Sequence, residues 1–91
     1  MTVLREISSI GLLHVEGLEP EPVGFYLRVT RRGGLIGGEG SIDGSPDAAE
    51  AAFHKGEATL SSDDGLLCTI QITRIGAAGI RFVTSGEIRG L

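Results

Sequence analysis

The stretch that decides the fold is residues 31–56, RRGGLIGGEGSIDGSPDAAEAAFHKG. Residues 31–44 are rich in glycine but keep the apolar side chains of a strand. Residues 45–56 have the start and stop signals of one short helix. Glycine allows a backbone to approach a neighbour closely, so residues 31–44 are where this chain could come unusually close to a partner. The segment also divides the chain into two β-type halves.

The helix is predicted over residues 46–55. Ser45 is a good N-cap, Pro46 suits the first helical position, and Gly56 suits a left-handed C-terminal cap. A helix this short needs tertiary contacts, and its apolar residues recur at helical spacing. We therefore expect Phe53 to dock the helix onto a sheet, beside Ala49 and Ala52.

Three strands are predicted before the helix. The first covers residues 3–15 and is expected to be bent or bulged at Gly11. The second, residues 24–31, alternates with a period of two, which indicates one buried and one wet face. Its inward set is Phe25, Leu27 and Val29, and its outward set is Tyr26, Arg28 and Thr30. Gly33 and Gly34 form a two-residue hairpin signal leading to a return strand over residues 35–42.

Three more strands are predicted after the helix, at residues 57–61, 66–75 and 80–84. Residues 62–65 and 76–79 are turn signals, and Ser85-Gly86 predicts a break or bulge in the last strand. The chain is therefore expected to be one domain, residues 1–91, of the mainly β class (α+β by strict count). We predict a small antiparallel β-barrel or strongly curved sheet of five to six strands, with the helix between strands three and four.

The composition restricts the possible partners. The 91 residues carry a formal net charge of -4, which disfavours general binding to nucleic acid or to an anionic membrane. No apolar run is long enough to span a bilayer or form a signal-peptide core. A single cysteine agrees with a reducing compartment, so we expect a cytoplasmic location. Abundant alanine, glycine and arginine suggest a bacterial source.

No motif for catalysis, a cofactor or a metal is found in the sequence. The glycines of residues 31–44 match neither the phosphate-loop nor the dinucleotide pattern. Cys68 falls on the inward side of its strand, which predicts a buried, inert thiol. No zinc-ligand spacing is present, although the sequence leaves open whether His14, His54, Asp63 and Asp64 converge. We therefore predict a protein that is not an enzyme and needs no cofactor.

The candidate interaction surface combines the basic hairpin with the glycine-rich strand. It consists of Tyr26, Arg28, Arg31, Arg32, Gly37, Gly38 and Gly40. Such residues suit a solvated face, a protein contact, or phosphate contacts with base stacking. We predict a small non-catalytic module that associates with itself, as a dimer, or with a larger protein partner. The alternative is a binder of a small ligand or single-stranded oligonucleotide on the barrel face.

Overall fold

The fold was analysed in a computed structural model that describes residues 2–91. Over these residues the chain forms six strands and one helix. In chain order they are β1 (Thr2–His14), β2 (Glu21–Arg32), β3 (Leu35–Ile42), α1 (Pro46–Lys55), β4 (Ala58–Ser62), β5 (Leu67–Gly76) and β6 (Gly79–Arg89). All paired strands are antiparallel, and they close a barrel in the order β1-β2-β3-β6-β5-β4. The predicted barrel and the position of the helix are confirmed. β2 and β6 are longer than predicted.

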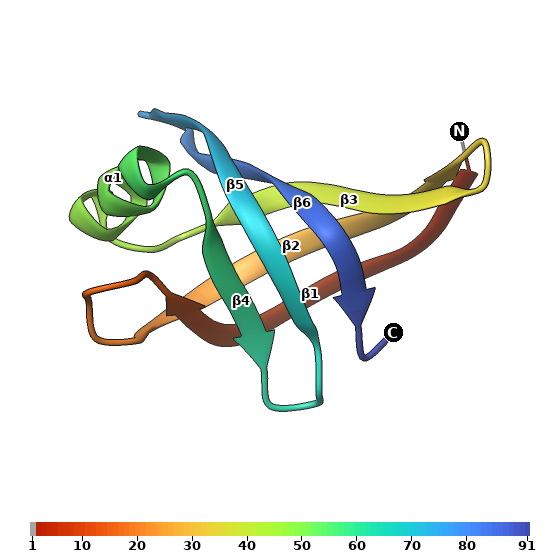
Figure 1. Ribbon diagram of the computed structural model, residues 1–91, viewed down its shortest axis with the longest axis horizontal. Helices are drawn as coiled ribbons and strands as arrows, with labels where there is room; N and C mark the ends of the chain where they lie inside the picture. Colours follow the sequence, from red (N-terminus) through yellow and green to blue (C-terminus); the bar gives the residue numbers. More distant parts are fainter. Residues whose placement is uncertain (1) are drawn as a thin grey trace.

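The barrel resembles two crossing layers, because β4, β5 and β6 run across β1, β2 and β3 (Figure 1). The space between the layers is filled by apolar side chains, and no polar or charged residue is buried in the described part of the chain. The deepest large side chains are Phe82, Leu13, Leu27, Leu60, Ile70 and Val29. The predicted alternation along β2 is confirmed, since Phe25, Leu27 and Val29 are buried and the residues between them are not. Burial of such side chains is the main stabilising contribution to folding.

Two glycines allow strands of the barrel to approach each other closely. A Cβ atom at Gly40 would lie 1.8 Å from the carbonyl oxygen of Tyr26. A Cβ atom at Gly11 would lie 2.1 Å from the carbonyl oxygen of Ser61. A bulge at Gly11, one of the two predicted irregularities, is absent, because the register with β2 runs without a shift through this residue. Gly11 instead makes room for β4, and the irregularity of β1 lies between Val3 and Arg5.

The helix α1 has the predicted caps and buries two of the three residues that were predicted to face the sheet. The Ser45 hydroxyl accepts a hydrogen bond from the Ala48 amide at 3.2 Å, and Gly56 has a φ of 92°. The buried residues are Ala48, Ala49 and Ala52, and the helix packs on β5. Phe53 is 55% exposed, so the prediction that it docks the helix is wrong. With 3.6 residues per turn, Phe53 lies about 90° around the helix from the centre of the alanine face. The small alanine side chains let α1 come close to the sheet and leave the phenyl ring outside.

Glycines also shape the turn between β2 and β3 and the end of β6. Gly33 and Gly34 have φ values of 58° and 86°, which confirms the predicted two-residue hairpin. Gly86 has a φ of 77°, and the β5–β6 register shifts around it. The predicted break or bulge at Ser85-Gly86 is therefore a bulge, and β6 continues to Arg89.

The helix α1 is too short to cross a bilayer, and no other helix is present in residues 2–91.

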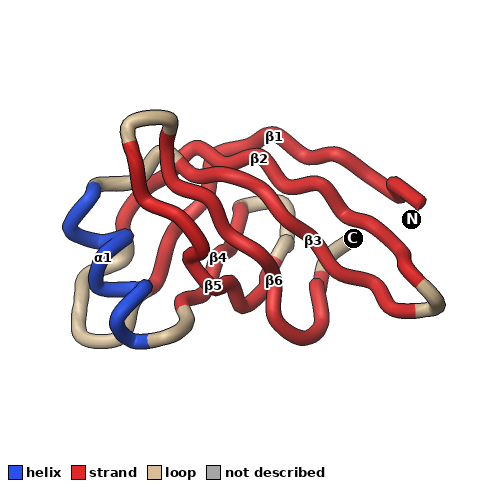
Figure 2. Tube along the Cα trace, turned by 90° about the horizontal axis from the view of Figure 1, so that it is seen from above, coloured by secondary structure: helices blue, strands red, loops and turns tan. Residues whose placement is uncertain are grey.

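Strand pairing is uneven around the barrel. The β1–β2 register extends from Thr2 to Leu13, whereas β1 pairs with β4 only from Gly11 to His14. β3 pairs with β6 only from Glu39 to Ile42. The start of β1, the end of β2 and the start of β3 therefore project from the barrel as a three-stranded ribbon. We call this ribbon the arm and define it as residues 2–10, 28–32 and 35–38 (Figures 1 and 2).

Candidate functional site

The arm has an open strand edge on each side. On the β1 side, residues 2–10 have no paired strand opposite β2 in the described structure, because β4 joins β1 only from Gly11 onward. On the β3 side, the ladder with β6 ends at Glu39. Unpaired strand edges expose backbone N–H and C=O groups that can pair with another chain.

The separation of β3 from β6 occurs at Gly38. The Gly38 amide donates to Thr84 Oγ1 at 2.8 Å, and the same hydroxyl lies 3.4 Å from the Gly38 carbonyl oxygen. A side chain of β6 thus occupies the place of a backbone partner. Beyond this point the two strands border an apolar cleft of about 620 Å³. Its lining consists of Gly34, Leu35, Ile36, Gly86, Glu87, Ile88 and Leu91.

The outer face of the arm carries a row of alternating charges. Arg28 lies opposite Glu6 on β1 and opposite Glu39 on β3, and it forms a salt bridge with Glu39. The phenol of Tyr26 donates a hydrogen bond to Glu6. The hydrogen bond and charge of Glu39 raise the pKa of Arg28, and the hydrogen bond to Glu6 raises the pKa of Tyr26. Because two carboxylates surround one guanidinium, this face is not a positive patch.

The predicted surface residues do not share one face. The register places Tyr26, Arg28, Arg32 and Gly37 on the outer face of the ribbon. Arg31 lies opposite Ile36, on the other face of the ribbon. This is the face of β2 that is buried at Phe25, Leu27 and Val29.

The remaining two predicted residues pack within the chain itself. A Cβ atom at Gly38 would lie 2.8 Å from Leu27 Cδ1, and Gly40 abuts Tyr26. These two glycines serve close packing of the barrel. Gly37 is open by comparison, because the nearest atom to a Cβ placed there would be Thr84 Oγ1, at 3.9 Å.

The exposed apolar side chains of the arm were missed by the sequence analysis. The arm carries Val3, Leu4, Ile10, Leu35 and Ile36 as exposed large hydrophobic residues. Leu35 is 78% exposed and Ile10 is 73% exposed. A usable signal exists in the sequence, since neighbouring residues of a strand point to opposite faces. In Val3-Leu4 and in Leu35-Ile36, therefore, only one of the two neighbouring side chains can face the core.

The histidines and the acidic turn do not form a metal site. No group of three or more His, Cys, Asp or Glu residues that could hold an ion occurs within residues 2–91. His14 Nε2 lies 3.1 Å from Ser61 Oγ, and His54 stacks edge-on against Phe53. Asp64 accepts a hydrogen bond from the Ser62 hydroxyl at 2.6 Å, which lowers the pKa of that carboxyl. His14, His54 and Asp64 thus each contact another side chain of the chain rather than converging on one point.

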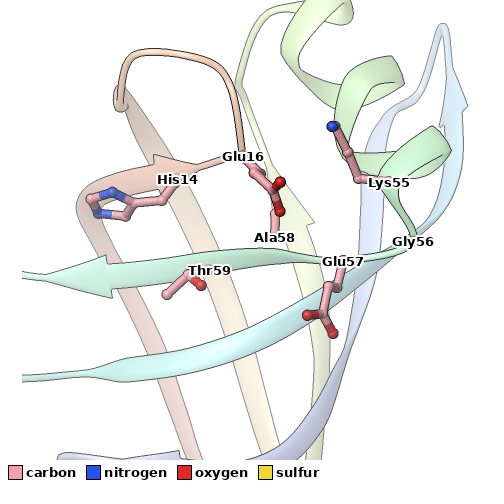
Figure 3. Close-up of a pocket in the computed structure, with 7 residues that line it drawn as sticks. All are labelled: His14, Glu16, Lys55, Gly56, Glu57, Ala58 and Thr59. Atoms are coloured by element: carbon pink, nitrogen blue, oxygen red, sulfur yellow. The ribbon is translucent and has the colours of Figure 1, made fainter.

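A polar cleft of about 410 Å³ lies where β1, α1 and β4 meet (Figure 3). It is lined by His14, Glu16, Lys55, Gly56, Glu57, Ala58 and Thr59. Figure 3 shows the imidazole of His14 directed away from Glu16 and Lys55. General acid–base catalysis requires groups that reach a common reacting atom. The side chains of this cleft diverge instead.

Cys68 is buried, as predicted, with 3% of its surface exposed. Burial raises the pKa of its thiol to about 11. A thiol with such a pKa carries little thiolate near neutral pH and is a poor nucleophile.

Comparisons with protein-family models, with curated proteins and with solved structures found no match for this chain.

Proposed function

We propose that this protein is a non-catalytic interaction module that associates with a protein chain through its projecting arm. The observation that carries the proposal is the open edge of β1 over residues 2–10, next to exposed apolar side chains. An exposed edge is a template for strand addition, and natural proteins normally cover or shorten such edges. A partner strand on β1 would satisfy the backbone groups and cover apolar surface in one step.

Size adds a second argument. A domain of 91 residues buries a limited fraction of its surface, and association with a partner would add to its stability by mass action. The arm places part of this short chain outside the barrel, where only a partner can bury it. We also retain, from composition alone, the proposal of a bacterial domain that acts in the cytoplasm.

The alternative of an oligonucleotide or small-ligand binder has less support. The guanidinium of Arg28 is engaged by Glu39 and lies beside Glu6, so phosphate would meet local negative charge. The net charge of -4 opposes the same binding mode.

The proposal can be tested by photo-cross-linking in the native host. A benzophenone amino acid replaces Ser8, which is exposed on the open edge, or Gln71, which is exposed on β5 as a matched control. We expect a product of defined mass from position 8 only. The captured chain is then identified and the complex reconstituted from purified proteins. Absence of a product at position 8, or equal capture at both positions, contradicts the proposal.

A further inference from the structure

The partner of the arm can be named from the sequence of the open edge itself. We propose that two copies of this chain form a dimer in which their β1 strands pair antiparallel over residues 4–10. The two-fold axis passes through Ile7, perpendicular to the sheet. This inference rests on the proposed interaction function and specifies the partner and the register.

The first argument is the length of the available edge. The irregularity between Val3 and Arg5 leaves Leu4 without a partner on β2 and marks one end of the regular strand. At the other end, Gly11 is occupied by Ser62 of β4. Within the open edge of residues 2–10, the part that lies between this irregularity and β4 is residues 4–10, and its midpoint is Ile7. With the axis at this residue, residues 4–10 of each copy lie opposite residues 4–10 of the other.

The second argument is the direction of the backbone groups. Gly38 turns its N–H and C=O toward Thr84, so strand alternation turns those of Glu39 toward Arg28 of β2. Arg28 therefore directs its N–H and C=O toward β3, and the next residue, Leu27, directs its own toward Ile7 of β1. Ile7 in turn directs its N–H and C=O toward Leu27. The groups of Glu6 and Ser8 then point to the open edge.

An axis through Ile7 places Glu6 of one copy directly opposite Ser8 of the other. Both residues direct their N–H and C=O groups to the edge, as a hydrogen-bonded antiparallel pair requires. Leu4 of one copy lies opposite Ile10 of the other at the end of this stretch.

The third argument is the match of the side chains. Across the axis, Leu4 lies opposite Ile10, and Ile7 lies opposite its own copy. The charged residues Arg5 and Glu6 lie opposite the serines Ser9 and Ser8. Opposed apolar residues stabilise antiparallel strands, whereas like charges directly opposite destabilise them. Leu4 and Ile10 are 39% and 73% exposed, so the pairing covers surface that the single chain leaves in water.

Other registers are less favourable. An axis at Arg5 or Glu6 would place two identical charges face to face. An axis at Ser8 would place the charged Glu6 of one copy opposite the apolar Ile10 of the other. The match of charged and apolar side chains therefore selects Ile7 as the axis, and it does so for a second copy of this chain.

The first test is disulfide trapping. Ile7→Cys lies on the axis, where opposite Cα atoms of a non-hydrogen-bonded pair are about 4.5 Å apart. Oxidation should convert this variant into a covalent dimer of twice the 9.5 kDa chain mass. Leu4→Cys and Ile10→Cys should cross-link when mixed and much less when each is oxidised alone. The controls are the unmodified protein, whose Cys68 is buried, and Thr73→Cys, which is exposed on β5.

The second test is the solution mass by light scattering and native mass spectrometry. We expect a dimer whose Kd rises by about ten-fold or more in Ser8→Pro, which removes an edge N–H, and in Ile10→Lys. Leu18→Lys is the matched control, because Leu18 is an exposed leucine in a loop. Circular dichroism verifies that each variant is folded.

A chain that stays monomeric at all concentrations, or a dimer that is unaffected by Ser8→Pro and not trapped by Ile7→Cys, overturns the proposed pairing. In either case, a different protein captured from position 8 and reconstituted with purified chain would leave the interaction function standing. Failure of both experiments removes both proposals.

Discussion

Thr84 replaces a backbone partner for Gly38. Its Oγ1 accepts from the Gly38 amide at 2.8 Å and lies 3.4 Å from the Gly38 carbonyl oxygen. This contact lies where the β3–β6 strand pairing ends, and it gives the N–H and C=O groups of Gly38 a hydrogen-bonding partner. The arm therefore leaves the barrel without an orphaned buried amide at its base.

Substitution of Thr84 should weaken the base of the arm. Thr84→Val keeps the shape but removes the acceptor, so the Gly38 amide loses its partner. We expect a loss of about 1 kcal/mol of unfolding free energy, or several degrees in Tm. Thr84→Ser retains the hydroxyl and should lie close to the wild type in a thermal melt. Equal stability of the valine and serine variants would contradict the role of this hydrogen bond.

The same substitution, glycine to alanine, should have very different effects on stability at two positions of β3. Gly40→Ala places a methyl group 1.8 Å from the Tyr26 carbonyl oxygen, and backbone must move to accept it. We expect a loss of about 3 kcal/mol or more in chemical denaturation. Gly37→Ala, with open space at its Cβ position, should change stability by about 0.5 kcal/mol or less. Similar effects at both positions would show that the strands do not approach as described.

The docking of α1 can be tested with a second matched pair. Ala49 is fully buried, so Ala49→Leu should separate the helix from β5 and cost about 1–3 kcal/mol. Phe53→Ala should cost about 0.5 kcal/mol or less, because the ring is mostly exposed. Urea unfolding of both variants decides the point. A larger loss in Phe53→Ala than in Ala49→Leu would restore the docking role that the sequence pattern predicts for the phenylalanine.

Local chemistry explains which parts of the fold were predictable. Ser45 and Gly56 bound the helix through contacts within a few residues, and the alternation of Phe25, Leu27 and Val29 is a local period. The position of Phe53 was not predictable in this way. A helical pattern gives the direction of a side chain, whereas its exposure depends on how closely the alanines let the helix approach.

The candidate site depends on contacts that are distant in the sequence. The alternation along β2 places Arg28 on the wet face, but the charge around it depends on the strand register. Glu6 and Glu39 become neighbours of Arg28 only after β1 and β3 align on β2. The open edge of β1 was missed because it is defined by the length of β4, a strand far away in the sequence.

The phenol of Tyr26 provides a spectroscopic test of the outer face. The chain has one tyrosine and no tryptophan, so ultraviolet titration reports this group alone. The hydrogen bond to Glu6 raises the pKa of Tyr26, and the charge of Arg28 opposes this shift. Glu6→Gln should therefore lower the pKa toward its ordinary value near 10, and Arg28→Gln should raise it further.

The same shift predicts a dependence of stability on pH. Since the folded pKa of Tyr26 lies above the unfolded value, its stabilising contribution is complete below pH about 10 and is lost as pH rises through the folded pKa. In Glu6→Gln this loss should be smaller over the same alkaline range. If Glu6→Gln and Arg28→Gln moved the pKa of Tyr26 in the same direction, the described contacts would be contradicted.

The uneven seams of the barrel also have a kinetic consequence. β1–β2 and β5–β6 are hairpins of neighbouring strands, whereas the seams β1–β4 and β3–β6 join distant parts of the chain through four residue pairs each. Closing the barrel therefore costs the conformational entropy of long loops, and each of these seams gains only four residue pairs in exchange. Folding should therefore be slow for a chain of this size. The two seams that join distant parts of the chain should open first in the native state, so amides along them should exchange with solvent before those of the β1–β2 and β5–β6 hairpins.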